Sequence, residues 1–127
     1  MIQSKQDAYD AIVEYFSQPG SQFGMAADKK VCRYRTEAGQ KCAVGCLIPD
    51  ELYDPEWEGS RVWMVYYRMR AAVVFGDVHD MGAFLEECQD CHDSAAMECR
   101  TMDDFLRDLK GVAEEHGLTV AGGLDRV

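Results

Sequence analysis

The sequence has no long apolar run and no leader-like beginning. Its first residues turn polar at once with Gln3, Ser4 and Lys5, whereas a secretory leader contains an apolar region of about 7–15 residues. No uninterrupted apolar stretch approaches the roughly 18 residues that a membrane helix requires. We therefore expect a cytoplasmic protein that makes no membrane contact.

Positive charge is scarce as well. Thirteen Lys and Arg residues face 23 Asp and Glu residues, which gives a formal net charge of −10. Because such a chain repels polyanions at long range, direct binding of nucleic acid is not expected. The charge is also segregated, since the segment from Asp77 to Glu98, both included, contains seven acids and no Lys or Arg.

Catalytic signatures are missing too. The sequence contains no phosphate-binding glycine loop, no ordered Ser-His-Asp signature and no dinucleotide fingerprint. Cys88 and His92 lie one helical turn apart, but nothing in the sequence supplies the third group and the oxyanion donors that a nucleophile needs. We therefore predict a non-enzymatic protein.

What is present is the composition of one ordinary domain. The chain has 127 residues, of which 47% are hydrophobic and 28% charged, as in typical globular proteins. No repeat or linker divides it. We predict a single domain over residues 1–127, in which about 121–127 form a flexible tail.

Helical spacing of apolar residues recurs in several segments. It predicts helices that begin after Ser4, near Asp80 and at Thr101, and it favours a helix over a strand for 60–73. Apolar residues also alternate within 60–73, so a strand remains open there. A shorter helical turn is expected over 50–57.

One segment favours a β-hairpin. Residues 31–35 and 41–48 flank a short linker that contains Gly39, and Pro49 ends the second run. Both faces of 41–48 are apolar, which is typical of a strand covered on both sides. The sequence therefore predicts an α+β fold, in which a small antiparallel β-hairpin or sheet packs against about four helices.

Acidic residues gather in two places. Glu86, Asp90 and Asp93 follow one another at helical spacing i, i+4 and i+7, and like charges so placed cost a few tenths of a kcal/mol per pair. Such a face is either simply solvated or a docking surface, and we predict a docking surface for a protein with a basic surface. The predicted partner-binding residues are Glu86, Asp90, Asp93, Asp50, Glu51, Asp54, Glu56 and Glu58.

The cysteines offer alternatives. Cys88, Cys91 and His92 form a C-x-x-C-H string, the pattern of haem attachment, but that reaction normally follows export and haem is not expected. Zinc is an alternative, although the spacing of the other cysteines lacks a C-x-x-C knuckle. Buried thiols without a cofactor are favoured, because these residues share a helical face with Phe84 and Leu85. The candidate metal ligands are Cys32, Cys42, Cys88, Cys91 and His92.

The stretch from Cys32 to Tyr53 contains a C-x-Y-R motif, then Gly39, then C-A-V-G-C-L-I-P-D-E-L-Y. It resembles a small protein family found in phage, prophage and bacterial genomes, and the likeness spans about residues 30–118. The resemblance implies no activity and no functional residue. By analogy with small acidic phage proteins, it suggests an inhibitor of a host nuclease or defence complex, acting in the host cytoplasm.

Together these observations predict a small acidic binding protein, of the phage- or prophage-encoded inhibitor type. The alternative is a zinc-stabilised structural or regulatory protein that uses Cys and His ligands. The chain is expected to be a monomer, or a homodimer if aromatic residues are exposed. The candidates for such a dimer patch are Trp57, Trp63, Tyr66 and Tyr67.

Overall fold

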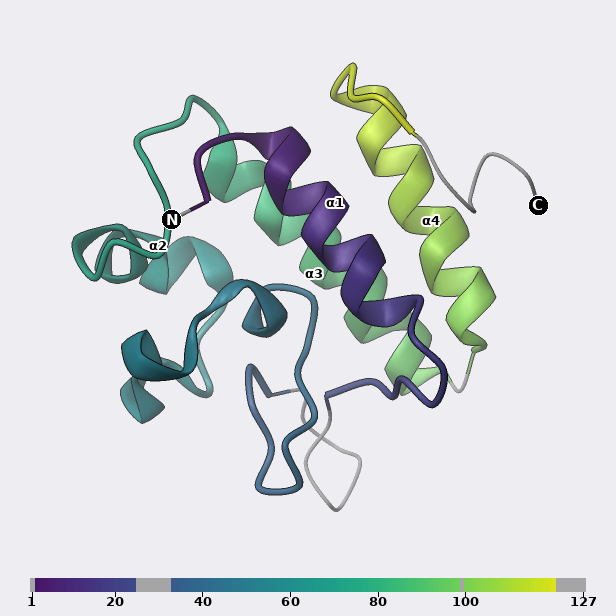
Figure 1. Ribbon diagram of the computed structural model, residues 1–127, viewed down its shortest axis with the longest axis horizontal. Coiled ribbons are helices and arrows are strands. Elements are labelled where there is room, and N and C mark those ends of the chain that lie inside the picture. Colours follow the sequence, from purple (N-terminus) through teal and green to yellow (C-terminus); the bar gives the residue numbers. More distant parts are fainter. Residues whose placement is uncertain (1, 25–32, 99, 121–127) are drawn as a thin grey trace.

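The computed structural model describes residues 2–24, 33–98 and 100–120. Within these ranges the chain forms four α-helices and three short 3-10 helices (Figure 1). The α-helices are α1 (Lys5–Phe16), α2 (Val62–Ala71), α3 (Met81–Met97) and α4 (Met102–Glu115). The 3-10 helices η1 (Gly45–Leu47), η2 (Asp50–Leu52) and η3 (Pro55–Trp57) lie between α1 and α2. The expected tail at 121–127 lies outside the described residues.

Helices α1 and α4 begin where a side chain caps the first turn. Ser4 accepts a hydrogen bond from the Asp7 amide at 3.0 Å and starts α1. Thr101 and Asp104 bond reciprocally to each other's backbone amides, so α4 begins with a capping box. These side chains satisfy amide groups that have no partner inside a helix.

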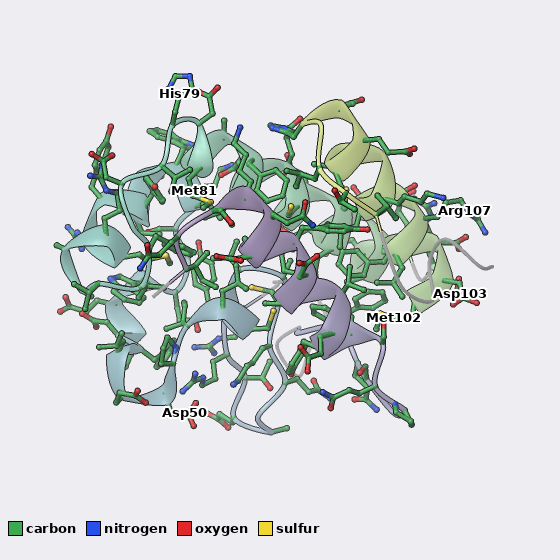
Figure 2. All side chains as sticks on the ribbon, turned by 45° about the horizontal axis from the view of Figure 1, so that its top comes forward. Asp50, His79, Met81, Met102, Asp103 and Arg107 are labelled. Atoms are coloured by element: carbon green, nitrogen blue, oxygen red, sulfur yellow. The ribbon has the colours of Figure 1, made fainter. Side chains whose placement is uncertain are left out.

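Helix α3 is the centre of the packing. It contacts α2 and α4, while α1 packs against η1 and α4. In Figure 1, α1 crosses in front of α3, with α4 on one side and α2 at the other end. Met81, Phe84, Leu85 and Cys88 of α3 are fully buried, and Figure 2 shows Met81 inside the molecule with Asp50, His79 and Arg107 on its periphery.

The predicted α+β fold is wrong, because no sheet forms in 2–24, 33–98 or 100–120. Arg35 and Lys41 form one antiparallel bridge around a tight turn, and the chain after Lys41 coils into η1. Residues 42–45 are buried consecutively, as are 47 and 48. An apolar run covered on all sides fits a buried helical turn as well as a buried strand, so its pattern could not tell them apart. Val31 and Cys32, at the start of the predicted hairpin, lie outside the described residues.

The segment 60–73 is mainly helical, as α2. After α2, a second isolated bridge pairs Phe75 with Ile2 in parallel. The Ile2 amide donates to the Val74 carbonyl at 3.0 Å, and the Gly76 amide donates to the Ile2 carbonyl at 2.7 Å. In the described part of the chain, none of the helices has the length and apolar character needed to cross a membrane.

Candidate functional site

A cleft of about 350 Å³ lies beside α3. One wall is α3 itself, and the others come from the segment before η1 and from the turn that leads into α2. Its lining is rich in polar and charged side chains that come from distant parts of the chain. The lining residues are Arg33, Tyr34, Cys42, Gly59, Ser60, Arg61, Val62, Glu86, Gln89, Asp93 and Met97.

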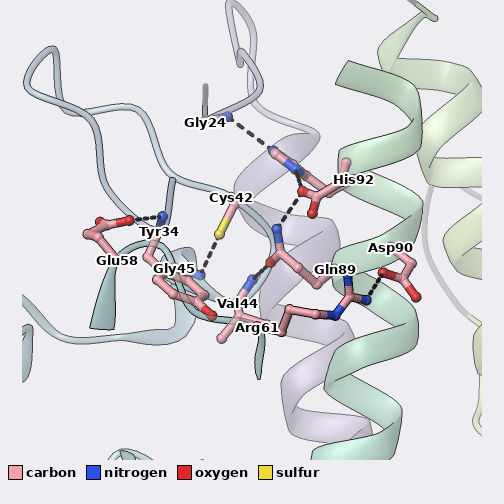
Figure 3. A network of polar contacts seen from close by, with 11 residues as sticks. Gly24, Tyr34, Cys42, Val44, Gly45, Glu58, Arg61, Gln89, Asp90 and His92 are labelled. Carbon is pink, nitrogen blue, oxygen red and sulfur yellow. Dashed lines mark hydrogen bonds and ion pairs between the residues drawn. The ribbon is translucent and has the colours of Figure 1, made fainter. Parts of the chain in front are cut away.

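A bridging arginine lies at the mouth of this cleft. Arg61 pairs with Glu86 at 2.5 Å and with Asp90 at 3.1 Å, and its side chain is 61% exposed. Figure 3 shows Arg61 reaching Asp90 on α3. Glu86 also accepts the Trp63 amide at 3.1 Å, which satisfies an amide in the first turn of α2. Two of the predicted acidic residues are therefore joined to one guanidinium group.

The pKa values of Asp90 and Arg61 reflect how closely these two side chains and Glu86 lie together. Burial raises the pKa of Asp90, and the neighbouring Glu86 carboxylate raises it further, while Arg61 opposes both effects. The hydrogen bond that Arg61 donates to Glu86 is the main cause of the raised pKa of Arg61. The site therefore holds two carboxylates close enough to repel each other, with a shared cation between them.

Behind the cleft a buried polar network joins three segments (Figure 3). His92 is fully buried, and its Nε2 accepts the Gly24 amide at 3.1 Å. Its Nδ1 therefore carries the ring proton and donates to Asp93 at 2.9 Å. Gln89 donates to the same Asp93 oxygen at 2.7 Å and accepts the Val44 amide at 3.0 Å. Neutral donors thus hold the Asp93 carboxylate in the cleft wall.

Glu58 is an internal residue in this structure. Its side chain is 10% exposed, and its carboxylate accepts the amides of Tyr34 and Arg35, both at 3.0 Å. The Tyr53 hydroxyl donates to it at 2.6 Å. Burial, together with this bond, raises the pKa of Tyr53 to about 12. These bonds hold the segment before η1 in place, and little of the Glu58 side chain is exposed to a partner.

The other acids of the first cluster lie outside the cleft lining. Asp50 pairs with Arg35 at 2.9 Å and Lys41 at 3.7 Å. Asp54 accepts the Glu56 amide and begins η3. Glu51 and Glu56 are exposed. The structure therefore brings Glu86, Asp90 and Asp93 together on α3, and it leaves the acids of 50–58 as a separate group.

The candidate metal ligands do not converge in the described residues. Within 2–24, 33–98 and 100–120, no three His, Cys, Asp or Glu side chains are gathered to hold a metal ion, and Cys32 lies outside these ranges. Both ring nitrogens of His92 are engaged. Burial raises the pKa of the Cys42 and Cys88 thiols well above the usual value, which disfavours the thiolate that zinc requires.

Burial also disfavours haem attachment, because Cys88 is fully buried and Cys91 is half-buried on the packed side of α3.

The structure also adds three residues that the sequence did not single out for the site: Arg61, Gln89 and Tyr34. Gly59 before α2, with φ +81°, is a local signal that the chain turns there. The pairing of residue 61 with residues 86 and 90 had no local signal.

Comparison of the chain with protein-family models, with curated proteins and with solved structures found no match. The resemblance to a phage and prophage family stays a prediction. The site itself comprises three carboxylates on α3, one exposed guanidinium group and a cleft beside them.

Proposed function

We propose that this chain is a small, non-enzymatic, acidic binding protein that receives a basic side chain of a partner protein at the cleft beside α3. The observation that carries the proposal is the bridge from Arg61 to Glu86 and Asp90. The site already accommodates a guanidinium group. An arginine or lysine from a partner would meet the same carboxylates in the same geometry.

Arg61 lies at the surface and is open to competition from solvent and from other cations. Its side chain is 61% exposed and its Asp90 partner is 56% exposed, so water screens this pair, whereas its second partner Glu86 is 18% exposed. Asp93 adds a third carboxylate in the cleft wall, with a 39% exposed side chain. The internal arginine thus acts as a weak competitor that keeps the carboxylates paired until a partner arrives.

The partner in this proposal is a protein with a basic surface. If the chain is encoded by a phage or prophage, as its resemblance suggests, a host nuclease or defence complex is the partner we propose. Nucleases carry basic surfaces because they bind phosphate backbones, so an acidic cleft is complementary to them. Blocking that surface would make the chain an inhibitor.

Argininamide is a suitable probe, because it carries the guanidinium group without a carboxylate. Added to the ¹⁵N-labelled chain, it is expected to shift the amide resonances of 86–93. The Arg61→Ala variant should bind it up to about fivefold more tightly, which corresponds to the contribution of an exposed ion pair. Asp90→Asn should weaken binding, and added salt should weaken it in every variant.

Glu114→Gln is the matched control, because Glu114 is an exposed acid on α4 outside the cleft lining. It should bind the probe like the wild type. Shifts spread evenly over all exposed acids, or binding that ignores both Arg61 and Asp90, would show that the cleft is not the site. Capture of one partner by the wild type but not by Asp90→Lys, from a lysate of the native host, would then identify the protein.

A further inference from the structure

The outer face of α2 carries large apolar side chains that the fold does not cover. Trp63 is 62% exposed, Met64 55% and Tyr67 73%. Of the four aromatic residues considered for a dimer patch, Trp63 and Tyr67 thus lie at the surface, and the other two are buried. Single exposed apolar residues are ordinary, but adjacent large ones on one helix face are typical of an interaction surface. Trp63, Met64 and Tyr67 are called the α2 face below.

A shallow groove of about 520 Å³ extends the α2 face beyond the end of the helix. Tyr67 belongs to both, and Val73, which is 58% exposed, lines the groove. Val73 has φ +58° and ends the helix in a Schellman pattern, where glycine is the usual residue. Glycine would therefore be the more stable choice for folding alone. An apolar side chain kept at a strained and exposed position is characteristic of a role beyond the fold.

The charged groups held at α2 balance one another. They are Arg61, Glu86 and Asp90 at the start of the helix and Arg68, Arg70 and Asp77 at its end. Three cations thus accompany three acids, in a chain whose net charge is −10. The α2 face is therefore a locally neutral part of an acidic protein, and its charge selects neither a basic nor an acidic partner.

The two ends of α2 nevertheless carry opposite charge. One arginine with two carboxylates leaves the start of the helix with one negative charge. Two arginines with one carboxylate leave its end with one positive charge. When two copies of the helix pack antiparallel about a two-fold axis, the start of each lies against the end of the other. The α2 face is therefore complementary in charge to a second copy of itself.

Antiparallel packing also brings favourable side-chain pairs together. With the two-fold axis between Met64 and Tyr67, each Met64 meets Tyr67 of the other copy, and methionine sulfur makes favourable contacts with aromatic rings. One residue further from the axis, each Trp63 meets Arg68, and an arginine over a tryptophan ring is a favourable cation–π pair. Arg68 is exposed and has no ion pair within the described ranges, so this contact gives it a partner.

We propose that the α2 face and its groove dock a second copy of this chain in an antiparallel, two-fold arrangement. Nucleic acid fits less well, because it requires several unpaired cations, and Arg70 is already paired with Asp77. The net charge of −10 repels a second copy as well, but the neutral faces are the parts that meet. The dimer is therefore weak, and salt strengthens it by screening the repulsion between the two chains.

Sedimentation velocity of the whole chain tests the association. We expect monomers at about 1 µM and dimers at about 1 mM, as for a small interface. Raising the NaCl concentration from about 50 to about 500 mM should strengthen the dimer roughly threefold or more. Argininamide binding at the α3 cleft should weaken over the same range, so salt distinguishes the two surfaces. A chain that stays monomeric at about 1 mM in high salt would overturn the proposal.

Two substitutions test the face itself. Tyr67→Ser should weaken the dimer about tenfold, because Tyr67 belongs to both the helix face and the groove. Arg68→Glu should weaken it about tenfold as well, because it removes the contact with Trp63 and the positive charge at the end of α2. A dimer of unchanged strength in both variants would assign association to another surface. Argininamide binding should be unchanged in Tyr67→Ser, so the two proposals fail separately.

Arg107→Glu is the matched control for Arg68→Glu. Arg107 is 73% exposed and lies on α4, and both substitutions change the net charge of the chain by the same amount. Arg107→Glu therefore adds the same long-range repulsion and leaves the α2 face intact. An equal loss in the two variants would show that net charge governs association and that the α2 face does not.

Val73→Gly separates docking from folding. It should raise the unfolding temperature, because it relieves the left-handed strain, and this temperature is measured where the chain is monomeric. It should nevertheless weaken the dimer about threefold, because the groove loses an apolar side chain. A dimer as strong as that of the wild type would show that the groove takes no part.

Cross-linking tests the antiparallel arrangement. In a Cys32→Ser and Cys99→Ser background, a mixture of Trp63→Cys and Arg68→Cys should form a disulfide faster than either variant alone. The mixed pair places the two cysteines opposite each other and keeps one Trp63–Arg68 contact. Faster cross-linking of Trp63→Cys with itself, or no cross-link in the mixture, would overturn the arrangement.

Discussion

At the scale of single residues, Gly45 shows how one missing side chain shapes the candidate site. A Cβ built at Gly45 would lie 1.9 Å from the Tyr34 carbonyl oxygen. Two backbone segments meet there, so no side-chain rotation relieves the clash. Gly45→Ala should therefore destabilise the protein by about 2–4 kcal/mol, as a severe overpacking in a core does. Urea unfolding followed by circular dichroism measures the difference.

Gly111 is the matched control for that substitution. It lies within α4, and a Cβ there would have nothing within 4 Å. Gly111→Ala should therefore stabilise the protein by about 0.5–1 kcal/mol, because alanine has the higher helix propensity. If both variants change stability in the same direction, the close contact between η1 and Tyr34 is not as the structure has it.

At the scale of elements, the start of α4 can be tested separately. Thr101 accepts the Asp104 amide at 3.1 Å, and Asp104 accepts the Thr101 amide at 3.1 Å. Thr101→Ala should lower the unfolding free energy by about 1 kcal/mol. Exposed Thr119→Ala, outside any described helix, should have little effect. A loss no larger in Thr101→Ala than in this control would rule out a stabilising cap.

The same capping box predicts a dependence on pH. The hydrogen bond from the Thr101 amide is the main cause of the lowered pKa of Asp104. The stabilisation is therefore present above the pKa of the unfolded state and is lost as the pH falls through the lower pKa of the folded state. Asp104→Asn should flatten this acid loss in urea titrations at several pH values. An identical pH profile in both proteins would contradict the assignment.

The helices and the segment 42–48 show what the sequence could predict. The starts of α1 and α4 depend on residues three positions apart, Ser4 with Asp7 and Thr101 with Asp104, so local patterns predicted them. The coil before η1 depends on Gln89, whose side chain accepts the Val44 amide from 45 positions away. A one-dimensional pattern contains no such partner, and the buried turn was therefore mistaken for a strand.

At the scale of the whole molecule, the candidate site was predicted in part for the same reason. The helical spacing placed Glu86, Asp90 and Asp93 on one helix face. Glu86 and Asp93 line the cleft, and Asp90 lies beside it and pairs with Arg61. Arg61 comes from another element, and His92 connects α3 to the loop at Gly24. These contacts exist only once the chain has folded. The acidic character of this helix face was therefore predicted, but the residues of the same chain that bind to it were not.

The thiols report on the folding of the whole molecule. Burial raises the pKa of Cys46 to about 12 and that of Cys91 to about 11, and it raises the pKa values of Cys42 and Cys88 well above normal. In a background with Cys32→Ser and Cys99→Ser, these four thiols should react slowly with a disulfide reagent at pH 8, because only a thiolate attacks. Denaturant should make the reaction fast.

The same shifts make stability fall at alkaline pH. Unfolded thiols lose their protons near pH 8.5, whereas the folded thiols keep theirs until the pH approaches their raised pKa values. Stability is therefore complete below the unfolded pKa and is lost as the pH rises beyond it, by up to about 1.4 kcal/mol per pH unit for a fully buried thiol and by less for half-buried Cys91. The urea midpoint should fall between pH 8 and pH 10, and Cys46→Ala should reduce that fall. A midpoint independent of pH over this range would mean that the thiols are not buried together in one cooperative core.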